Sequence, residues 1–157
     1  MKSILISIKP KWVAKILGRD KTIEIRKTAP KCELPIDVYI YCTKGAYIGY
    51  LSKKYVGKVV AKFTLKEIEE CVNPYFPKGT FATKTMTYEG LLSKSQLTET
   101  EFSEYINKGS RGYAWHISDL QLLDNLMKPS GFDDLMELSD FGLKRAPQSW
   151  CYVEVEK

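Results

Sequence analysis

The sequence predicts an α+β domain in which five or six short strands form a mixed or antiparallel barrel, with one early helix and one or two later helices. Two observations predict this fold class. Short runs rich in Val, Ile and Tyr recur along the chain, and such runs are typical of strands. Helical patterns are few and short. No repeat or Gly/Ser linker divides the 157 residues, so we expect one domain spanning residues 1–157.

The first part of the chain predicts a strand, a short helix and a second strand. Residues 4–8 form a short apolar run that ends before Pro10. Residues 11–17 carry apolar side chains at helical spacing, and Pro10 stands at the first turn, where its missing N–H costs nothing. Residues 21–27, KTIEIRK, alternate between polar and apolar side chains, which predicts a strand.

Runs of β-branched and aromatic residues predict four more strands, at 37–42, 56–65, 112–123 and 150–155. Residues 45–54 are rich in glycine and tyrosine, and we expect an exposed hairpin or loop there.

Helical signals are fewer in this part of the chain. Residues 66–71 suggest a helical turn. The pattern Thr98-x-x-Glu101 is a capping box that predicts a helix to about residue 107. Residues 129–147 are expected to be loop with short helical turns, and residues 73–95 give no clear pattern.

The composition is that of a soluble globular protein, with 44% hydrophobic and 27% charged residues. No run approaches the roughly 20 apolar residues of a membrane span. The first apolar run is short and is broken by Lys9 and Pro10, which excludes a secretory signal. We therefore expect a cytoplasmic protein with no membrane partner.

The cysteines do not suggest a metal site. They are scattered, without a CxxC pair, and the chain has a single histidine, His116. This spacing argues against zinc, and free thiols are expected in the cytoplasm. We expect no metal and no cofactor.

Charge is distributed unevenly along the chain. Residues 1–66 hold 15 Lys or Arg against 4 Asp or Glu, whereas residues 67–157 hold 9 against 15. Such a split suggests a basic surface that faces a polyanion. Alternatively, the lysines only solubilise the first half, or the fold interleaves the two halves.

The strand 21–27 is the strongest candidate site. Alternation places Glu24 and Arg26 on one face, and the turn before the strand allows Lys21 to reach the same side. Arg suits bidentate contact with a phosphate or a base edge, and Lys acts as a mobile charge. The plain alternative is a surface strand with an ion pair worth up to about 1 kcal/mol.

His116 is either a packed histidine or a general acid or base that works near neutral pH. Aromatic residues either stack against bases or pack in the core. The complete set of expected ligand-binding residues is Lys9, Lys11, Lys21, Glu24, Arg26, Tyr41, Lys44, Lys62, Ser118 and Trp150.

Several blocks of the sequence resemble the ASCH family, small domains of the PUA-like barrel superfold. The strand–helix–turn start and K-x-x-E-x-R of residues 21–26 are similar to the family's G-x-K-x-x-E-x-R signature. Four further blocks resemble members from phage and bacterial genomes: VYIYCTK (38–44), VGKVVAKF (56–63), YAWHISDL (113–120) and RAPQSWCYVE (145–154). The resemblance implies a PUA-like mixed β-barrel with a cleft beside the first helix.

The resemblance also implies a function in binding RNA or modified nucleosides, and some members are similar to ribonucleases or to amidohydrolases acting on N4-acetylcytidine. The sequence departs from this pattern at three positions. Either Arg19 stands at the usual glycine site or the turn is remodelled. Glu24 stands where the amidohydrolases carry a threonine nucleophile, and Lys62 stands where they carry a glutamate. The second and third departures, at Glu24 and Lys62, favour binding over that hydrolysis.

Three functions follow from these observations. The first is a module that binds RNA, a nucleoside or a nucleotide. The second is a metal-independent hydrolase of RNA or of acylated cytidine, in which Lys21, Glu24 and His116 take acid–base roles. The third is a protein-interaction factor, with the acidic second half as its partner surface.

Overall fold

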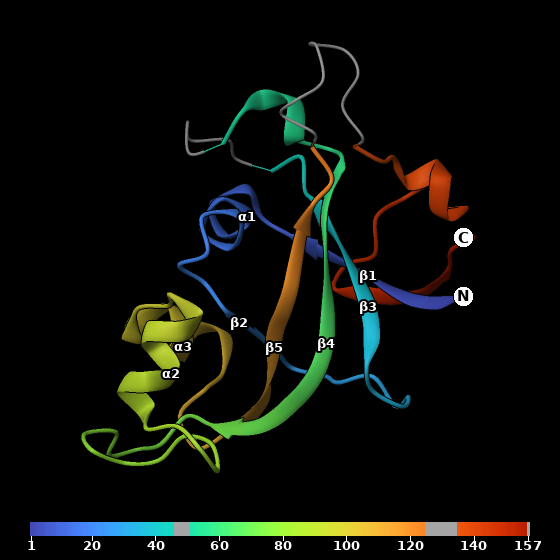
Figure 1. The fold of residues 1–157 in the computed structure, drawn as a ribbon. Helices are drawn as coiled ribbons and strands as arrows, with labels where there is room; N and C mark the ends of the chain where they lie inside the picture. Colours follow the sequence, from blue (N-terminus) through green and yellow to red (C-terminus); the bar gives the residue numbers. More distant parts are fainter. Residues whose placement is uncertain (46–50, 125–134, 157) are drawn as a thin grey trace.

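The computed structural model describes residues 1–45, 51–124 and 135–156, and its centre is a single six-stranded mixed sheet (Figure 1). The strands are β1 (Lys2–Ile8), β2 (Ile23–Arg26), β3 (Ile36–Cys42), β4 (Val59–Val72), β5 (Arg111–Leu122) and β6 (Trp150–Glu154). The helices are α1 (Pro10–Leu17), α2 (Tyr88–Ser95) and α3 (Glu99–Tyr105), with 3₁₀ turns at Lys53–Tyr55 and Leu138–Phe141. The predicted α+β class is therefore confirmed.

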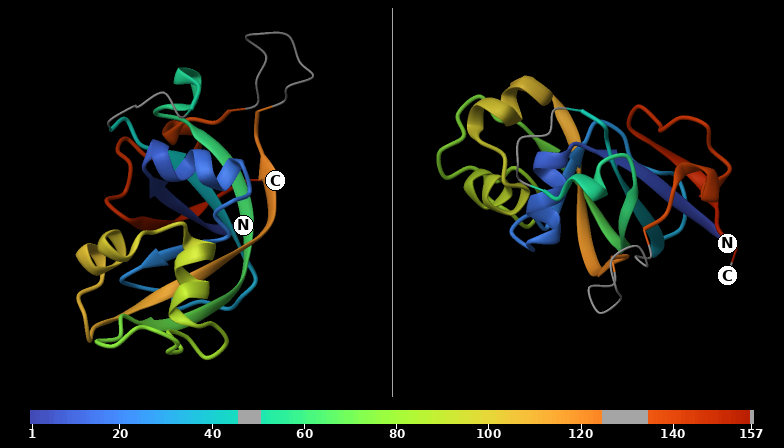
Figure 2. Two further views of the ribbon diagram at one scale, coloured as in Figure 1. Left: turned by 90° about the vertical axis from the view of Figure 1, so that its left-hand side faces the viewer. Right: turned by 90° about the horizontal axis from the view of Figure 1, so that it is seen from above.

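The sheet has the order β2-β5-β4-β3-β1-β6, in which β1 pairs with β3 in parallel and every other pair is antiparallel. The long strands β4 and β5 bend strongly, and two shifts of register interrupt their pairing (Figures 1 and 2). Such bulges increase the twist and curvature of a sheet. The sheet curls like a barrel, but no ladder of the described residues joins its two edges, β2 and β6.

The inside of the curl holds the main hydrophobic core. Fully buried Ile4, Ile6, Val38, Phe63 and Trp115 belong to it, and α1 packs against it. Such close packing of large apolar side chains is the main stabilising contribution in a domain of this size.

A second core lies between the sheet and the helix pair α2 and α3, apart from α1 (Figures 1 and 2). Ile23 and Ile25 of β2 contact this core, which also contains Leu91 and Phe102. The alternation of KTIEIRK therefore works as predicted, because the isoleucines face the helices and leave Glu24 for the other side. Among the described residues, no helix has the length and hydropathy needed to cross a bilayer.

The predicted helical turn at 66–71 is wrong. These residues continue β4, in which Ile68 pairs with Trp115 and Cys71 pairs with Gly112. The acidic residues of this stretch lie on a strand that a register shift between Leu65 and Ile68 makes irregular, so the sequence lacks a clean period of two.

Helix α2 was not predicted, because it is short and mostly polar. Its N-cap is Thr87, whose Oγ1 accepts a hydrogen bond from Gly90 N at 3.1 Å. The capping box at Thr98 and Glu101 is present as predicted and starts α3. Residues 46–50 of the expected loop at 45–54, and residues 129–134 of the expected loop at 129–147, lie outside the described residues.

Candidate functional site

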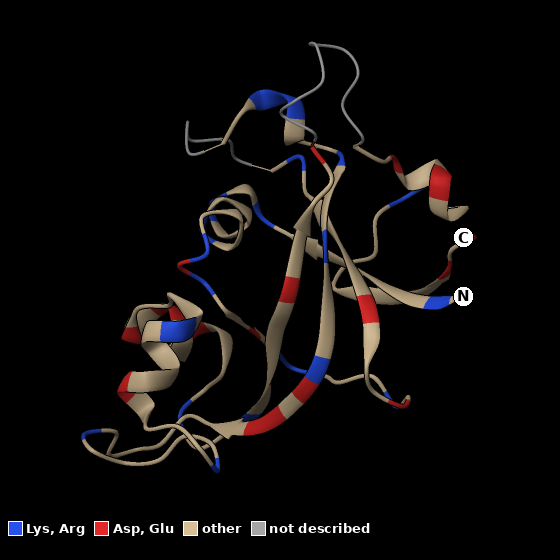
Figure 3. Ribbon diagram, viewed as in Figure 1, with Lys and Arg blue, Asp and Glu red and all other residues tan. Residues whose placement is uncertain are grey.

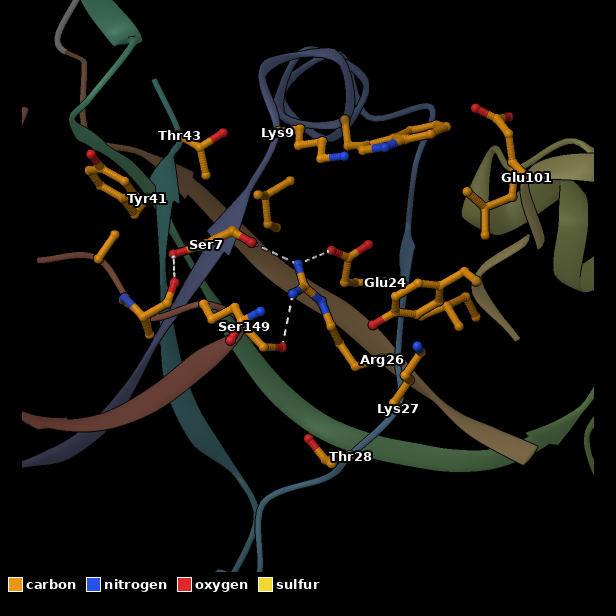
Figure 4. A pocket seen from close by; sticks show the side chains of 18 of the residues that line it. Ser7, Lys9, Glu24, Arg26, Lys27, Thr28, Tyr41, Thr43, Glu101 and Ser149 are labelled. Atoms are coloured by element: carbon orange, nitrogen blue, oxygen red, sulfur yellow. Dashed lines mark hydrogen bonds and ion pairs between the residues drawn. The ribbon is translucent and has the colours of Figure 1, made fainter. Parts of the chain in front are cut away.

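A pocket of about 870 Å³ lies where the curled sheet stays open, beside α1 and between β2 and the segment that enters β6 (Figure 4). This volume is within the range of ligand-binding cavities. The charged and aromatic lining residues are Lys9, Trp12, Lys21, Glu24, Arg26, Lys27, Tyr41, Lys44, Glu101, Glu104 and Tyr105. Five of these carry positive charge and three carry negative charge.

The wall on the β2 side contains a buried chain of three charges. Glu24 is 7% exposed and Lys21 is 2% exposed. Lys21 Nζ lies 3.2 Å from Glu24 Oε1, and Arg26 Nη2 lies 2.7 Å from Glu24 Oε2. One carboxylate therefore serves two cations, which leaves the triad with a net positive charge.

Burial and the neighbouring charges set the protonation of this triad. Burial lowers the pKa of Lys21, and its ion pair with Glu24 offsets only part of that effect. Burial alone would raise the pKa of Glu24, but the charges of Lys21 and Arg26 outweigh it and hold the pKa below its ordinary value. Glu24 is therefore ionised at neutral pH, and the amine of Lys21 gives up its proton more readily than a lysine in water.

Arg26 links the two sides of the open sheet. Its Nη2 donates to the backbone oxygen of Ser7 on β1 at 2.8 Å, and its Nη1 donates to Ser149 Oγ at 3.1 Å (Figure 4). Ser7 Oγ in turn donates to the backbone oxygen of Pro147 at 2.7 Å. One guanidinium thus connects β2 to β1 and to the start of β6, in place of a backbone ladder.

The turn before β2 directs Lys21 into the pocket. Arg19 has a φ of 67°, the left-handed conformation that glycine adopts most readily. The backbone N–H of Lys21 then donates to Lys15 O at 3.0 Å, and its Nζ donates to Ser95 O at 2.6 Å. The turn before β2 therefore places an arginine in a conformation that glycine adopts more readily.

The rim of the pocket is basic and aromatic. The amine of Lys27 lies 5.0 Å from the centre of the Tyr105 ring, and Lys11, just outside the lining, lies 4.6 Å from the Trp12 ring. Lys11 also pairs with Glu101 at 2.9 Å. Lysines beside aromatic faces suit a ligand that carries both a ring and a negative charge.

The uneven charge of the sequence is partly cancelled by the fold. Acidic and basic residues follow one another on β4 (Figure 3). Four lysines of the first half pair with acids of the second half: Lys11 with Glu101, Lys54 with Asp124, Lys58 with Glu137, and Lys66 with Asp119. Only part of the basic half therefore remains available to a polyanion.

The structure separates the predicted site residues into two sets. Lys9, Lys21, Glu24, Arg26, Tyr41 and Lys44 line the pocket together. Lys11, Lys62, His116, Ser118 and Trp150 are not part of its lining.

His116 belongs to the opposite face of the sheet. In the pairing of β2 with β5, His116 is opposite Ile23, whereas Glu24 is opposite Trp115. Directly paired residues share a face, so His116 and Glu24 point to different sides. His116 Nε2 instead lies 2.8 Å from Glu69 Oε2.

Lys62 and Trp150, outside the pocket lining, contact other side chains of the protein. Lys62 lies near the Tyr39 ring, at 5.8 Å. Trp150 packs edge-on against Trp115, with ring centres 5.6 Å apart, and its Nε1 donates to Thr28 Oγ1 at 2.9 Å.

One group among the described residues has the donor set for a cation. The carboxylates of Glu67 and Glu69 and the imidazole of His116 place one ligand atom each within 4.8 Å of one another. Glu69 is already bonded to Thr85 Oγ1 at 2.6 Å and to His116. Two of the three members, Glu69 and His116, are therefore already bonded to each other.

Sequence reasoning missed the pocket residues that come from distant segments. Ser7, Pro147 and Ser149 meet only because β6 pairs with β1. The sequence gives a local indication for only one of these three residues, Ser7, which is a polar residue inside the apolar run ILISI.

No protein-family model and no curated protein matches the chain. Solved structures do match it. The crystal structure of ASCH from Zymomonas mobilis has a TM-score of 0.67 at 17% identity, covering 97% of this chain and 87% of that one. A serine-to-alanine mutant of that protein has a TM-score of 0.64 at 17% identity, covering 97% and 88%. A tyrosine-to-phenylalanine mutant has the same score and identity, covering 98% and 91%. These likenesses confirm the expected fold.

Proposed function

We propose that this chain, which has the fold of the Zymomonas mobilis ASCH protein, is an ASCH-type domain of the cytoplasm whose pocket binds RNA or a modified nucleoside. The observation that carries the proposal is the pocket itself, in which basic side chains and aromatic rings surround a concavity of about 870 Å³. The sequence blocks that resemble the ASCH family imply the same class of ligand.

The lining divides into two parts with different roles in this proposal. Lys9 and Lys44 are exposed and, with Lys27, are placed to contact phosphates. Trp12 and Tyr105 offer ring faces on which a base stacks. The buried triad around Glu24 forms the wall, where a carboxylate acceptor next to a cation selects a base by its hydrogen-bonding edge.

Binding of labelled single-stranded RNA, followed by fluorescence anisotropy, tests the proposal. If the three rim lysines each contact a phosphate, raising the salt from about 50 to 200 mM should weaken binding about 20-fold. Each substitution Lys9→Gln, Lys27→Gln or Lys44→Gln should lower the slope of log affinity against log salt by about 0.7.

The control is Lys66→Gln, which removes the same charge from β4 outside the pocket lining. We expect it to leave the salt slope unchanged. Binding that is equal at both salt concentrations, or no binding of RNA or nucleosides at all, would contradict the proposal.

A second candidate is hydrolysis of an RNA phosphodiester or of a nucleoside N-acyl group. The pair of Lys21 and Glu24 favours it, because a buried amine with a lowered pKa next to a carboxylate can accept a proton. His116 has no part in this candidate, since it faces the other side of the sheet.

Incubation of the pure protein with labelled RNA and with N4-acylated cytidine tests the second candidate. Turnover that is lost in Lys21→Met and Glu24→Gln, at a temperature where circular dichroism shows both variants folded, supports it. No turnover, or turnover that both variants retain, counts against it.

A further inference from the structure

The segment between β4 and α2 exposes three aromatic rings. Tyr75 is 67% exposed, Phe76 is 88% exposed and Phe81 is 60% exposed, the highest values for large hydrophobic side chains in the described residues. Such rings are usually buried, and a group of exposed ones marks an interaction surface. We call residues 73–84 the aromatic loop.

Hydrogen bonds hold the aromatic loop in one shape. Val72 N donates to Ala82 O at 2.9 Å at its base. Within it, Thr80 Oγ1 donates to the backbone oxygen of Phe76 at 2.8 Å, which closes a tight turn between Phe76 and Phe81. The two phenylalanines are therefore presented at either side of a defined turn.

The charge of the aromatic loop is positive. No Asp or Glu occurs from residue 71 to residue 88, whereas Lys78 and Lys84 both lie in the loop. The first acid that follows, Glu89, accepts a hydrogen bond from Gly79 N at 3.1 Å. Exposed rings interleaved with lysines, in a segment without acids of its own, fit a partner that has both flat rings and negative charge.

The aromatic loop is attached to the end of α3, which forms part of the pocket. Asn73 Nδ2 donates to Ile106 O at 2.7 Å, and Gly109 N donates to Asn73 O at 2.7 Å. A Cβ at Gly109 would come within 3 Å of the Tyr75 ring, so this ring lies on the segment. That segment follows directly on Tyr105, a pocket residue.

We propose that the aromatic loop is a second contact surface for single-stranded RNA, which leaves the pocket past Tyr105 and stacks bases on Phe76 and Phe81. The inference rests on the proposed function and narrows it, because a ligand that needs both surfaces is a strand and not a free nucleoside. Lys78 and Lys84 contact the phosphates between the stacked bases.

The test compares two probes on one set of variants. The probes are a nucleoside monophosphate and a single-stranded RNA of about 12 nucleotides, a length that spans several stacking positions. Phe76→Ala and Phe76→Leu should each weaken binding of the oligonucleotide by about 5- to 150-fold, the range of one lost base stack. Phe76→Trp should bind like the original protein, and binding of the monophosphate should not change in any variant.

Because the Phe76 side chain is almost entirely exposed, these variants should unfold at the original temperature. Tyr152→Leu is the control, since it removes a partly exposed ring from β6 at the opposite edge of the sheet from β2. It should not change binding of either probe.

The outcomes separate this inference from the proposed function. If Phe76→Ala and Phe81→Ala bind the oligonucleotide as tightly as the original protein does, the aromatic loop is no RNA surface, and the pocket proposal stands. If Phe76→Leu retains the binding that Phe76→Ala loses, the contact is apolar and base stacking is refuted. If the original protein binds neither probe, the proposed function itself fails.

Discussion

Replacing Glu24 by glutamine should strongly destabilise the protein. The carboxylate contacts Lys21 at 3.2 Å and Arg26 at 2.7 Å, and it is almost fully buried. In Glu24→Gln these two cations face each other without a counter-ion, and removing one partner from a buried ion pair costs about 3–5 kcal/mol. For a chain of 157 residues this free energy corresponds to a fall in melting temperature of about 6–20 °C.

The dependence on pH gives this prediction a second signature. Burial holds the pKa of Lys21 in the folded protein below its ordinary value of 10.5. At a pH between the lowered pKa and 10.5, the folded protein therefore holds fewer protons than the unfolded chain. Stability therefore rises with pH across that window. Without the carboxylate of Glu24, the pKa of Lys21 falls further, and the window extends to lower pH in the variant.

Thermal denaturation followed by circular dichroism, repeated from neutral to alkaline pH, measures both effects. The control is Glu70→Gln, the same chemical change at an exposed ion pair with Arg111 on β4 and β5. The control should melt close to the original temperature. If Glu24→Gln melts together with the control at neutral pH, the triad does not stabilise the fold and the reasoning is refuted.

Three further predictions use other features of the fold. Because the pKa of Glu24 is held below its ordinary 4.5, the original protein should lose stability as the pH falls through and below that value, while Glu24→Gln should lack this part of the loss, as melting curves in acid will show. Burial raises the pKa of Cys42 and of Cys71 to about 11. Neither thiol should therefore react with a disulfide reagent at mildly alkaline pH until the protein is unfolded. Rapid modification of all four thiols in the native protein would contradict this. Arg19→Gly should stabilise the protein by up to about 1 kcal/mol in urea unfolding. A residue other than glycine in the left-handed conformation costs about 1–2 kcal/mol, and glycine loses part of that gain because its unfolded chain has more conformational entropy. A clear loss of stability would contradict this prediction.

Alternation within one strand was enough to predict part of the site. Because successive strand residues point to opposite faces, the pattern of KTIEIRK sends Ile23 and Ile25 to one core and Glu24 and Arg26 to the other side. Lys21 reaches the same side as Glu24, although the alternation of the strand would place it with the isoleucines. It does so through the turn before β2, which the sequence indicated only as a place where the direction of the chain is free.

The parts that the sequence did not predict depend on pairing between strands. Whether His116 shares a face with Glu24 is decided by the register of β5 against β2, and a shift of one residue would have reversed the outcome. Ser7 and Ser149 are separated by most of the chain, and no local pattern links them. The extension of β4 through residues 66–71 was missed because its register shift breaks the alternation.

The pairing of β6 with β1 has a consequence for the order in which the molecule is assembled. Of the two strands that flank β1, β3 follows it closely in the sequence, whereas β6 is separated from it by most of the chain. The partners of Arg26 come from both ends, Ser7 and Ser149. Contacts between residues so far apart in sequence are slow to form. During folding, β2 can therefore be in place before the pocket is closed, so ligand binding should begin only when β6 has paired with β1.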